Sequence, residues 1–163
     1  MKKHYYFIFV LASFLIACNE DKSIDVTVMP EETATGADTF GCLVDGWLYV
    51  GGRYSDRYWN INAQESILFR YTSDNKMSVE VKVKDRNEPY AYLAFTIIEP
   101  VDKQHCTFID AQWLDKLSSD NKGIPLGNGT VEITRFDKTK KIISGRFSGS
   151  QITHGQFDVH YIE

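Results

Sequence analysis

From Thr39 onward, apolar and polar residues alternate with a period of two, which is typical of strands with one face in a core. The clearest case is Met77–Val83, where odd-numbered positions are apolar and even-numbered positions are polar. Tyr90–Ile98 is apolar at both sets of positions and predicts a central strand covered on both faces. The predicted strands span 40–44, 47–50, 65–72, 77–83, 90–98, 107–114, 129–136, 142–147 and 156–161.

Turn chemistry separates these runs. Asp45-Gly46 lies between two apolar segments and predicts a two-residue hairpin, because glycine accepts the positive φ of a type I′ turn. Residues 149–155 predict a loop, and 107–114 has a short helix as its alternative, since Ile109 and Trp113 fall at helical spacing. Short strands joined by short turns predict an all-β fold, an antiparallel β-sandwich or a partly closed barrel of about eight to ten strands.

The N-terminus has the three parts of a bacterial secretory signal. Two lysines follow Met1, residues 5–17 are apolar apart from Ser13, and the small Ala17 precedes Cys18. These 13 residues are too few to span the hydrocarbon core of a bilayer, which needs roughly 20 helical residues. A signal peptide over 1–17 is therefore favoured over a transmembrane anchor.

The residues Leu15-Ile16-Ala17-Cys18 resemble the lipobox of bacterial lipoproteins, whose cysteine receives a lipid. The resemblance implies a membrane-anchored protein lipidated at Cys18; the alternative is a plain secretory signal in which this cysteine is incidental. Residues 18–38 are then the lipidated cysteine and a flexible tether, and residues 39–163 form the all-β domain. Loss of 1–17 leaves 146 residues with 16 basic and 22 acidic side chains, a balance that gives no electrostatic reason to bind nucleic acid.

A second resemblance covers the layout of the domain. Phe40-Gly41-Cys42-Leu43-Val44-Asp45-Gly46 opens it, and Ser144–Gly149 and Ile152–Val159 close it. This arrangement resembles small lipoproteins of the Bacteroidetes type that share an all-β domain without an assigned function. The acidic residues after Cys18 also resemble the export signal of Bacteroidetes surface lipoproteins. Together these resemblances imply the cell envelope, at the outer membrane and on its exposed surface, and they assign no site residue.

Two cysteines remain in the domain once Cys18 is set aside. An envelope location permits a disulfide, so the sequence leaves open a bridge between Cys42 and Cys106 or two buried free thiols. Adjacent His105 and Cys106 point to opposite faces of a strand and are not expected to work together in catalysis. The remaining histidines show no metal-ligand spacing, and no metal or cofactor is expected.

Aromatic residues gather between 47 and 59. Trp47, Tyr49, Tyr54, Tyr58 and Trp59 fall within 13 residues and suggest a ligand site, because flat rings stack on the apolar faces of sugars. The alternative is that Trp47 and Tyr49 are core residues of a hairpin. The sequence favours a non-enzymatic module that binds a glycan or a protein. A hydrolase of envelope polysaccharide or peptide, and an assembly subunit that pairs through strand edges, are the alternatives.

Overall fold

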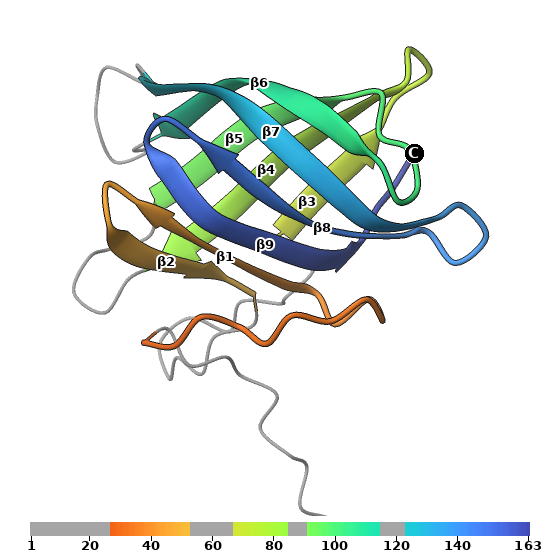
Figure 1. The fold of residues 1–163 in the computed structure, drawn as a ribbon, viewed down its shortest axis with the longest axis horizontal. Helices are drawn as coiled ribbons and strands as arrows, with labels where there is room; N and C mark the ends of the chain where they lie inside the picture. Colours follow the sequence, from red (N-terminus) through yellow and green to blue (C-terminus); the bar gives the residue numbers. More distant parts are fainter. Residues whose placement is uncertain (1–26, 53–66, 85–90, 115–122) are drawn as a thin grey trace, which may run out of the picture.

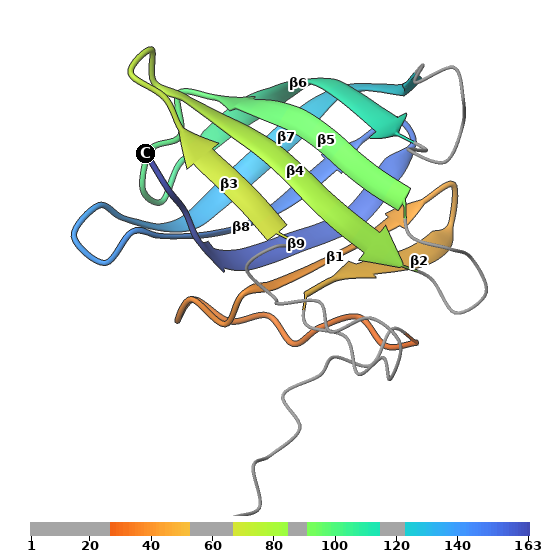
Figure 2. The ribbon, with the colours of Figure 1, turned by 180° about the vertical axis from the view of Figure 1, so that it is seen from behind.

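The computed structural model describes residues 27–52, 67–84, 91–114 and 123–163, and this part of the chain forms nine antiparallel strands. Their order in the sheet is β2-β1-β9-β8-β7-β6-β5-β4-β3, and β2 also pairs with β4. That pairing closes β1, β2 and β4 to β9 into an eight-stranded barrel with β3 as an additional strand (Figures 1 and 2). The all-β prediction is confirmed, and the architecture is the barrel. The strands are β1 (Thr39–Val44), β2 (Trp47–Gly51), β3 (Ile67–Tyr71), β4 (Lys76–Lys84), β5 (Ala91–Ile98), β6 (His105–Leu114), β7 (Ile124–Asp137), β8 (Ile142–Gly149) and β9 (Ile152–His160).

Strands β2 and β3 share one side of β4 and close the barrel together. The last two residues of β2 pair with the C-terminal end of β4, and β3 pairs with the preceding part of β4. The other side of β3 reaches the chain that follows β9. There the Tyr71 amide donates to the Ile162 carbonyl at 2.7 Å, and the Ile162 amide donates to the Phe69 carbonyl at 2.9 Å. The barrel is therefore closed by two sets of hydrogen bonds, one between β2 and β4 and the other between β3 and Ile162.

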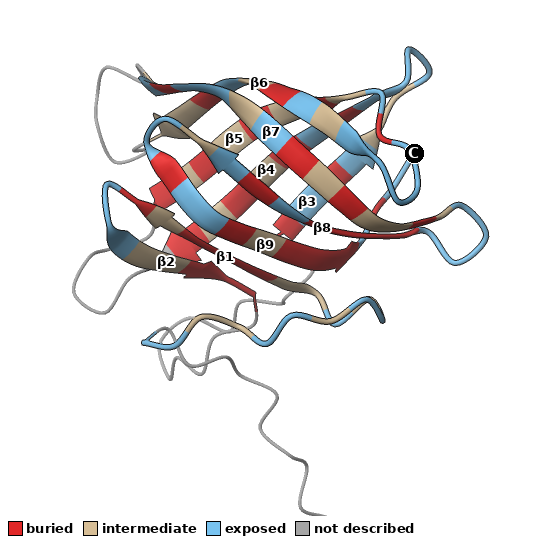
Figure 3. Ribbon diagram, viewed as in Figure 1, coloured by how far each residue is buried: buried red, intermediate tan, exposed pale blue. Residues whose placement is uncertain are grey.

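Phenylalanine rings fill the barrel interior. Phe147 of β8 lies among them, with its ring centroid between 5.2 and 6.1 Å from those of four others. Strand β9 passes close to this ring at Gly155, where a Cβ atom would lie 2.5 Å from a Phe147 ring carbon. Eight strands enclose a space that side chains can just fill, so the interior is a packed core (Figure 3). Six of the buried rings are at most 3% exposed, those of Phe40, Phe69, Phe95, Phe108, Phe147 and Phe157, and the ring of Phe136 is 9% exposed.

The predicted hairpin between β1 and β2 is confirmed. Val44 pairs with Trp47, so Asp45 and Gly46 are the only residues of the turn, and both have positive φ, +49° and +84°. Positive φ at both central positions is what a type I′ turn requires. The turn also contacts the neighbouring connection, because the Asp45 amide donates to the Gln151 carbonyl at 3.0 Å.

Three details differ from the sequence predictions or decide between them. Residues 107–114 belong to a strand, so the helix alternative is wrong. Strand β9 begins at Ile152, so the predicted loop over 149–155 shrinks to a two-residue turn, because Gly155 packs against Phe147 within the strand. On β5 the buried residues alternate with half-buried ones, so this strand is fully covered on its inner face only.

Candidate functional site

Residues 27–38, which we call the strap, lie against the outside of the barrel (Figure 1). Met29 and Pro30 lie over Gly41 of β1. The Pro30 carbonyl accepts a hydrogen bond from the side-chain amide of Gln156 on β9. We expected this part of the chain to be a flexible tether. It is instead docked on the barrel, because polar side chains of β8 and β9 bind its backbone and side chains.

Asp158 of β9 holds the strap in place. The residue is only 2% exposed, and its carboxylate accepts hydrogen bonds from both sides. The backbone amides of residues 35–37 donate to it at 2.8–3.1 Å, and Thr33 Oγ1 donates at 2.5 Å. Ser144 Oγ, on the neighbouring strand β8, donates at 2.7 Å. One buried carboxylate thus joins the strap to two strands of the barrel.

The hydrogen bonds keep this buried carboxylate charged. Burial by itself raises the pKa of the Asp158 carboxyl. The hydrogen bonds from Thr33, from Ser144 and from the backbone of Thr35 and Ala37 outweigh burial and lower the pKa from 3.8 to about 2. The carboxylate is therefore ionised at neutral pH, and the strap is bound to a negative charge.

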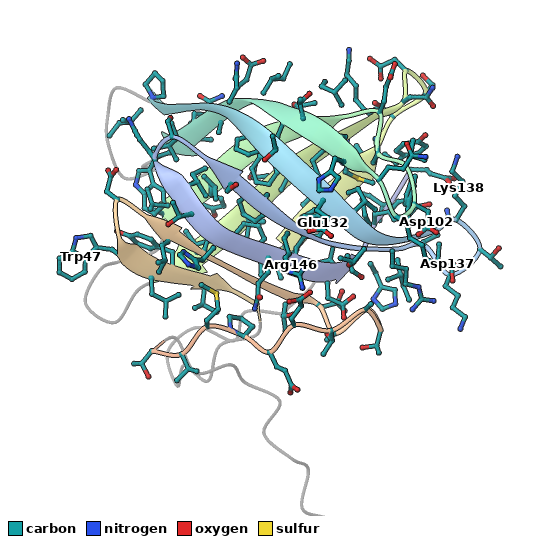
Figure 4. All side chains as sticks on the ribbon, in the orientation of Figure 1. Trp47, Asp102, Glu132, Asp137, Lys138 and Arg146 are labelled. Carbon is teal, nitrogen blue, oxygen red and sulfur yellow. The ribbon has the colours of Figure 1, made fainter. Side chains whose placement is uncertain are left out.

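A groove of about 770 Å³ lies between the strap and the outer faces of the barrel strands, and we call it the outer groove. Met29 of the strap, Leu43 of β1 and Leu48 of β2 give it an apolar wall. Polar side chains of β6 to β9 form the rest, among them the labelled Glu132 and Arg146 in Figure 4. The groove therefore combines apolar and polar surface along one side of the molecule.

A row of polar side chains crosses the outer groove. His105, Glu132, Arg146 and Gln156 are successive cross-strand partners on β6, β7, β8 and β9, so they project from the same outer face. Arg146 lies 3.3 Å from Glu132 Oε2 and 2.8 Å from Oε1 of Glu32 in the strap. The hydrogen bond to Glu32 and then the bond to Glu132 raise the pKa of the Arg146 guanidinium. Arg146 thus links the strap to the row.

A bulge places His154 in the outer groove. Between Gly41 and Leu43 of β1 the partner strand β9 has one additional residue. His154 lies in this bulge with a φ of +52°, in the left-handed region that few residues other than glycine adopt. Thr153 and His154 are consequently both exposed, although they are adjacent in a strand. Bulges that redirect a side chain in this way are frequent beside binding sites.

The outer groove offers hydrogen-bonding groups of several kinds. Thr130 and Ser148 are direct cross-strand partners and present two hydroxyl groups, and the Gln156 amide can both donate and accept. Its two carboxylates, those of Glu32 and Glu132, contact the same guanidinium. Among the residues that the structure describes, no group of three or more His, Cys, Asp or Glu side chains could hold a metal ion.

The predicted aromatic site is only partly within the described chain. Tyr54, Tyr58 and Trp59 lie outside the described residues. Tyr49 is half-buried against the core, with its ring centroid 4.7 Å from that of Trp113 on β6. Trp47, on the same face of β2, is 65% exposed at the end of the barrel (Figure 4). The structure therefore places Tyr49 at the edge of the core and Trp47 on the surface, and neither lines the outer groove.

Both cysteines of the described domain are free thiols in the structure. Cys42 is buried in the core on β1, and Cys106 is half-buried on β6; neither is in a disulfide. Burial raises the pKa of the Cys42 thiol to about 12 and that of the Cys106 thiol to about 11. Thiols with such pKa values are almost entirely protonated at neutral pH, which makes them poor nucleophiles.

A second depression, of about 730 Å³, lies at the opposite end of the barrel from the β1–β2 turn. Four of its charged residues contact groups of the protein itself. Asp102 Oδ1 accepts a hydrogen bond from the Phe136 amide at 2.7 Å, and Asp137 lies 2.7 Å from Arg135. The Lys138 ammonium lies 5.5 Å from the Phe136 ring centroid, within the range of a cation–π contact (Figure 4). This depression therefore has fewer groups available to a ligand than the outer groove.

The polar row was not found from the sequence. Thr130, Glu132 and Thr134 alternate with buried residues, so their outward direction was readable from the pattern. Glu132 lies beside Arg146 only because β7 pairs with β8 in this register. Glu32 lies in the segment for which the sequence predicts a flexible tether. The only signal for the site was the concentration of polar residues on the outer faces of the last three strands.

Comparisons with family models, with curated proteins and with solved structures give no match. The structure also contains, within its described residues, no helix of the length and apolarity needed to cross a membrane. Function must therefore be inferred from the geometry of this chain and from its N-terminal sequence.

Proposed function

We propose that the protein is a non-enzymatic binding module of the cell envelope that is anchored through a lipid on Cys18 and binds an extended glycan in the outer groove. The anchor is supported by the apolar segment 5–17 and the small residue before Cys18. The resemblance to small Bacteroidetes-type lipoproteins supports an outer-membrane location. The binding function is supported by the structure of the domain.

Because side chains fill the interior of the barrel, a ligand is expected to bind on the outer surface. Six phenylalanine rings inside the barrel are at most 3% exposed, and they contact one another across its width. A barrel that carries a ligand inside needs an interior free of such side chains. Of the two depressions described above, the outer groove, at about 770 Å³, is similar in volume to the second, at about 730 Å³, and has more groups available to a ligand.

The juxtaposition of apolar and hydroxyl-bearing side chains in the outer groove is the observation that carries the proposal. A sugar ring has apolar C–H faces, which suit contact with Met29, Leu43 and Leu48. Its hydroxyl groups suit hydrogen bonds with Ser148 and Gln156. The groove runs across several strands and is open to solvent, which suits a chain of sugars better than a single small molecule.

A bulky substitution in the outer groove tests this proposal. Ser148 is an exposed residue of β8 within the groove, and Ser78 is an exposed residue of β4 outside it. Each serine lies within a strand and has a threonine as a cross-strand partner, so Ser78→Trp is a matched control for Ser148→Trp. We expect Ser148→Trp to weaken binding to a wild-type-positive glycan at least tenfold, while Ser78→Trp leaves it unchanged.

Binding is measured on a glycan array and then by titration calorimetry, and the melting temperature of each variant is recorded. Equal binding by both variants would place the ligand elsewhere on the molecule. A wild-type protein that binds no glycan at millimolar concentration would contradict the glycan proposal. Product analysis after incubation separates binding from hydrolysis, because a hydrolase shortens the glycan and a binding module returns it intact.

The assembly alternative depends on free strand edges. Strands β1 and β4 to β9 each pair with strands on both sides, so the closed barrel favours binding through the outer groove over addition of a strand. Light scattering on the purified protein addresses this alternative directly, and we expect a monomer.

A further inference from the structure

We propose that the end of the barrel bearing Trp47 rests on the lipid headgroup surface of the membrane and so fixes the orientation of the molecule. This inference rests on the lipid anchor of the proposed function and goes beyond it, since an anchor alone leaves the barrel free to turn. We call this end the Trp47 end. It contains the β1–β2 turn and the start of β7 (Figure 1).

The Trp47 end exposes large apolar side chains. Trp47 is 65% exposed at the start of β2, and Figure 4 shows its side chain extending away from the barrel. Ile124, the first residue of β7, is 61% exposed. Tryptophan is enriched where membrane proteins meet the headgroup layer, because its ring is apolar and its N–H is polar. These two side chains therefore suit a lipid surface.

The path of the strap brings the anchor to the same end. From Met29 over Gly41, the strap runs toward residues 33–37 on Asp158, which is the direction away from the β1–β2 turn. Its beginning at Thr27 therefore faces the Trp47 end, as the orange segment in Figures 1 and 2 shows. Val28, next to this point, is 58% exposed and adds apolar surface.

The length of the chain before the strap limits its distance from the membrane. Nine peptide steps separate Cys18 from Thr27, and they span at most about 30 Å in any conformation. The contact of Met29 with Gly41 and the hydrogen bond from Gln156 to the Pro30 carbonyl hold the start of the strap on the barrel, so the point where the chain leaves is fixed too. A lipid on Cys18 therefore holds the Trp47 end, in preference to the opposite end, close to the bilayer.

The opposite end carries lysines, which would suit an anionic membrane if they were free. Lys76 lies 2.6 Å from Asp74, and Lys141 lies 3.2 Å from Glu163. Lys138 lies over the Phe136 ring. Asp74 and Glu163 therefore balance the charge of two of these lysines, whereas Lys138 keeps its charge over the ring. The reversed orientation is an outcome that the experiment below detects.

Tryptophan quenching by brominated lipid tests the orientation. The full-length lipidated protein is reconstituted into vesicles of phosphatidylethanolamine and phosphatidylglycerol that contain a phospholipid brominated near the headgroup end of its acyl chains. We expect wild-type fluorescence to be quenched, and Trp47→Phe to lower the quenched fraction at least twofold. Trp113→Phe, which replaces an indole fluorophore at the core edge by a phenyl ring, should leave the quenched fraction of the remaining signal at least as large as in wild type.

A tryptophan at the opposite end of the barrel serves as a second fluorescent reporter of contact with the membrane. Val101 is 44% exposed in the connection between β5 and β6, and Val101→Trp in the Trp47→Phe background places a tryptophan there. We expect no additional quenching from this residue. Strong quenching at Val101→Trp, or equal quenching with and without Trp47, would overturn the proposed orientation.

Flotation and mass spectrometry keep the two proposals distinguishable. A protein that carries acyl chains and floats with vesicles, but whose Trp47 is not quenched, contradicts the orientation and leaves the anchor in place. A protein that lacks acyl chains and does not float contradicts both. Melting temperatures of the variants within a few degrees of wild type show that the fluorescence of each variant comes from a folded barrel.

Discussion

Thr33 Oγ1 donates a hydrogen bond to Asp158 Oδ2 at 2.5 Å, and the two residues are 125 positions apart in the sequence. The contact joins the segment before the first strand to the last strand of the barrel. It belongs to a set of hydrogen bonds from residues 33–37 and from Ser144 that converge on one buried carboxylate. The strap is therefore a part of the folded domain.

Replacing Asp158 should release the strap and destabilise the protein. Asp158→Asn removes the charge and turns one acceptor oxygen into an N–H donor that faces the donors of the strap. We expect a loss of about 2–4 kcal/mol in the free energy of unfolding, the range for breaking a buried charged hydrogen-bond network. Urea denaturation measures it.

Ser144→Ala removes a single donor from the same carboxylate and serves as the control. Its expected cost is about 1 kcal/mol, smaller than that of Asp158→Asn. Equal stabilities of wild type and Asp158→Asn would show that the charge of Asp158 contributes nothing to the stability of the folded protein.

The same carboxylate predicts a pH dependence of stability. The pKa of Asp158 is about 2 in the folded protein against 3.8 as its ordinary value, so between these values the unfolded state binds more protons. Its contribution is therefore complete only above about pH 5 and is lost as the pH falls through 3.8 toward 2. The contribution is about 2 kcal/mol. Denaturation of wild type and Asp158→Asn between pH 2 and pH 6 should give curves that converge in acid.

Parallel curves in that experiment would assign the acid sensitivity to other groups. Asp74 and Asp137 also have lowered pKa values, Asp74 chiefly through its hydrogen bond with Lys76 and Asp137 chiefly through the amide of Lys140. Both side chains are much more exposed than Asp158, so solvent screens their interactions and their share of the pH dependence is small.

Trp47 and Trp113 should differ in their effect on stability. Trp47 is mostly exposed, so Trp47→Ala should change the free energy of unfolding by less than about 0.5 kcal/mol. Trp113 packs on Tyr49 and on the core, so Trp113→Ala should cost about 3 kcal/mol. Chemical denaturation of both variants measures the difference. A larger loss of unfolding free energy for Trp47→Ala than for Trp113→Ala would indicate that Trp47 is part of the core.

The free thiols should be protected by folding. Cys42 is fully buried with a pKa of about 12, and Cys106 is half-buried with a pKa of about 11. At pH 8, iodoacetamide should leave Cys42 unmodified in the folded protein and react only slowly with Cys106. In urea without a reductant both should be alkylated within minutes, which peptide mass spectrometry detects. A cysteine that stays unmodified until a reductant is added would indicate a disulfide.

The strands were predictable because their signals are local. Alternation at Met77–Val83 and the Asp45-Gly46 turn each depend on a few adjacent residues, and both are confirmed. Closure of the barrel was not predictable, since it depends on a short pairing between β2 and β4, which are far apart in the sequence. The loop expected around Gly155 was wrong because glycine serves close packing against Phe147 there as well as it would serve a turn.

The candidate site was hidden for the same reason. Trp47 and Tyr49 attracted notice because aromatic residues cluster in the sequence, and this clustering could not separate an exposed ring from one at the core edge. Glu132 and Arg146 meet only because β7 and β8 pair in one particular register, and Glu32 joins them only because the strap is docked. Sites formed across strands need the register, which the sequence does not provide.

Removing the hydroxyl group of Tyr161 should not destabilise the protein. Tyr161 is 2% exposed, and its hydroxyl is a buried polar atom that has no hydrogen-bond partner among the residues that the structure describes. Its ring packs 5.5 Å from that of Phe136 and 6.0 Å from that of Tyr71, so the ring contacts survive in Tyr161→Phe. Burial of an unpartnered hydroxyl costs about 1–3 kcal/mol, and its removal should leave the free energy of unfolding unchanged or raise it by about 1 kcal/mol.

Tyr71→Phe, which removes a hydroxyl that donates to Asn75 at 2.9 Å, is the control and should lower stability slightly. A clear loss of stability in Tyr161→Phe, measured by urea denaturation, would mean that the hydroxyl has a partner in solution, such as a bound water molecule.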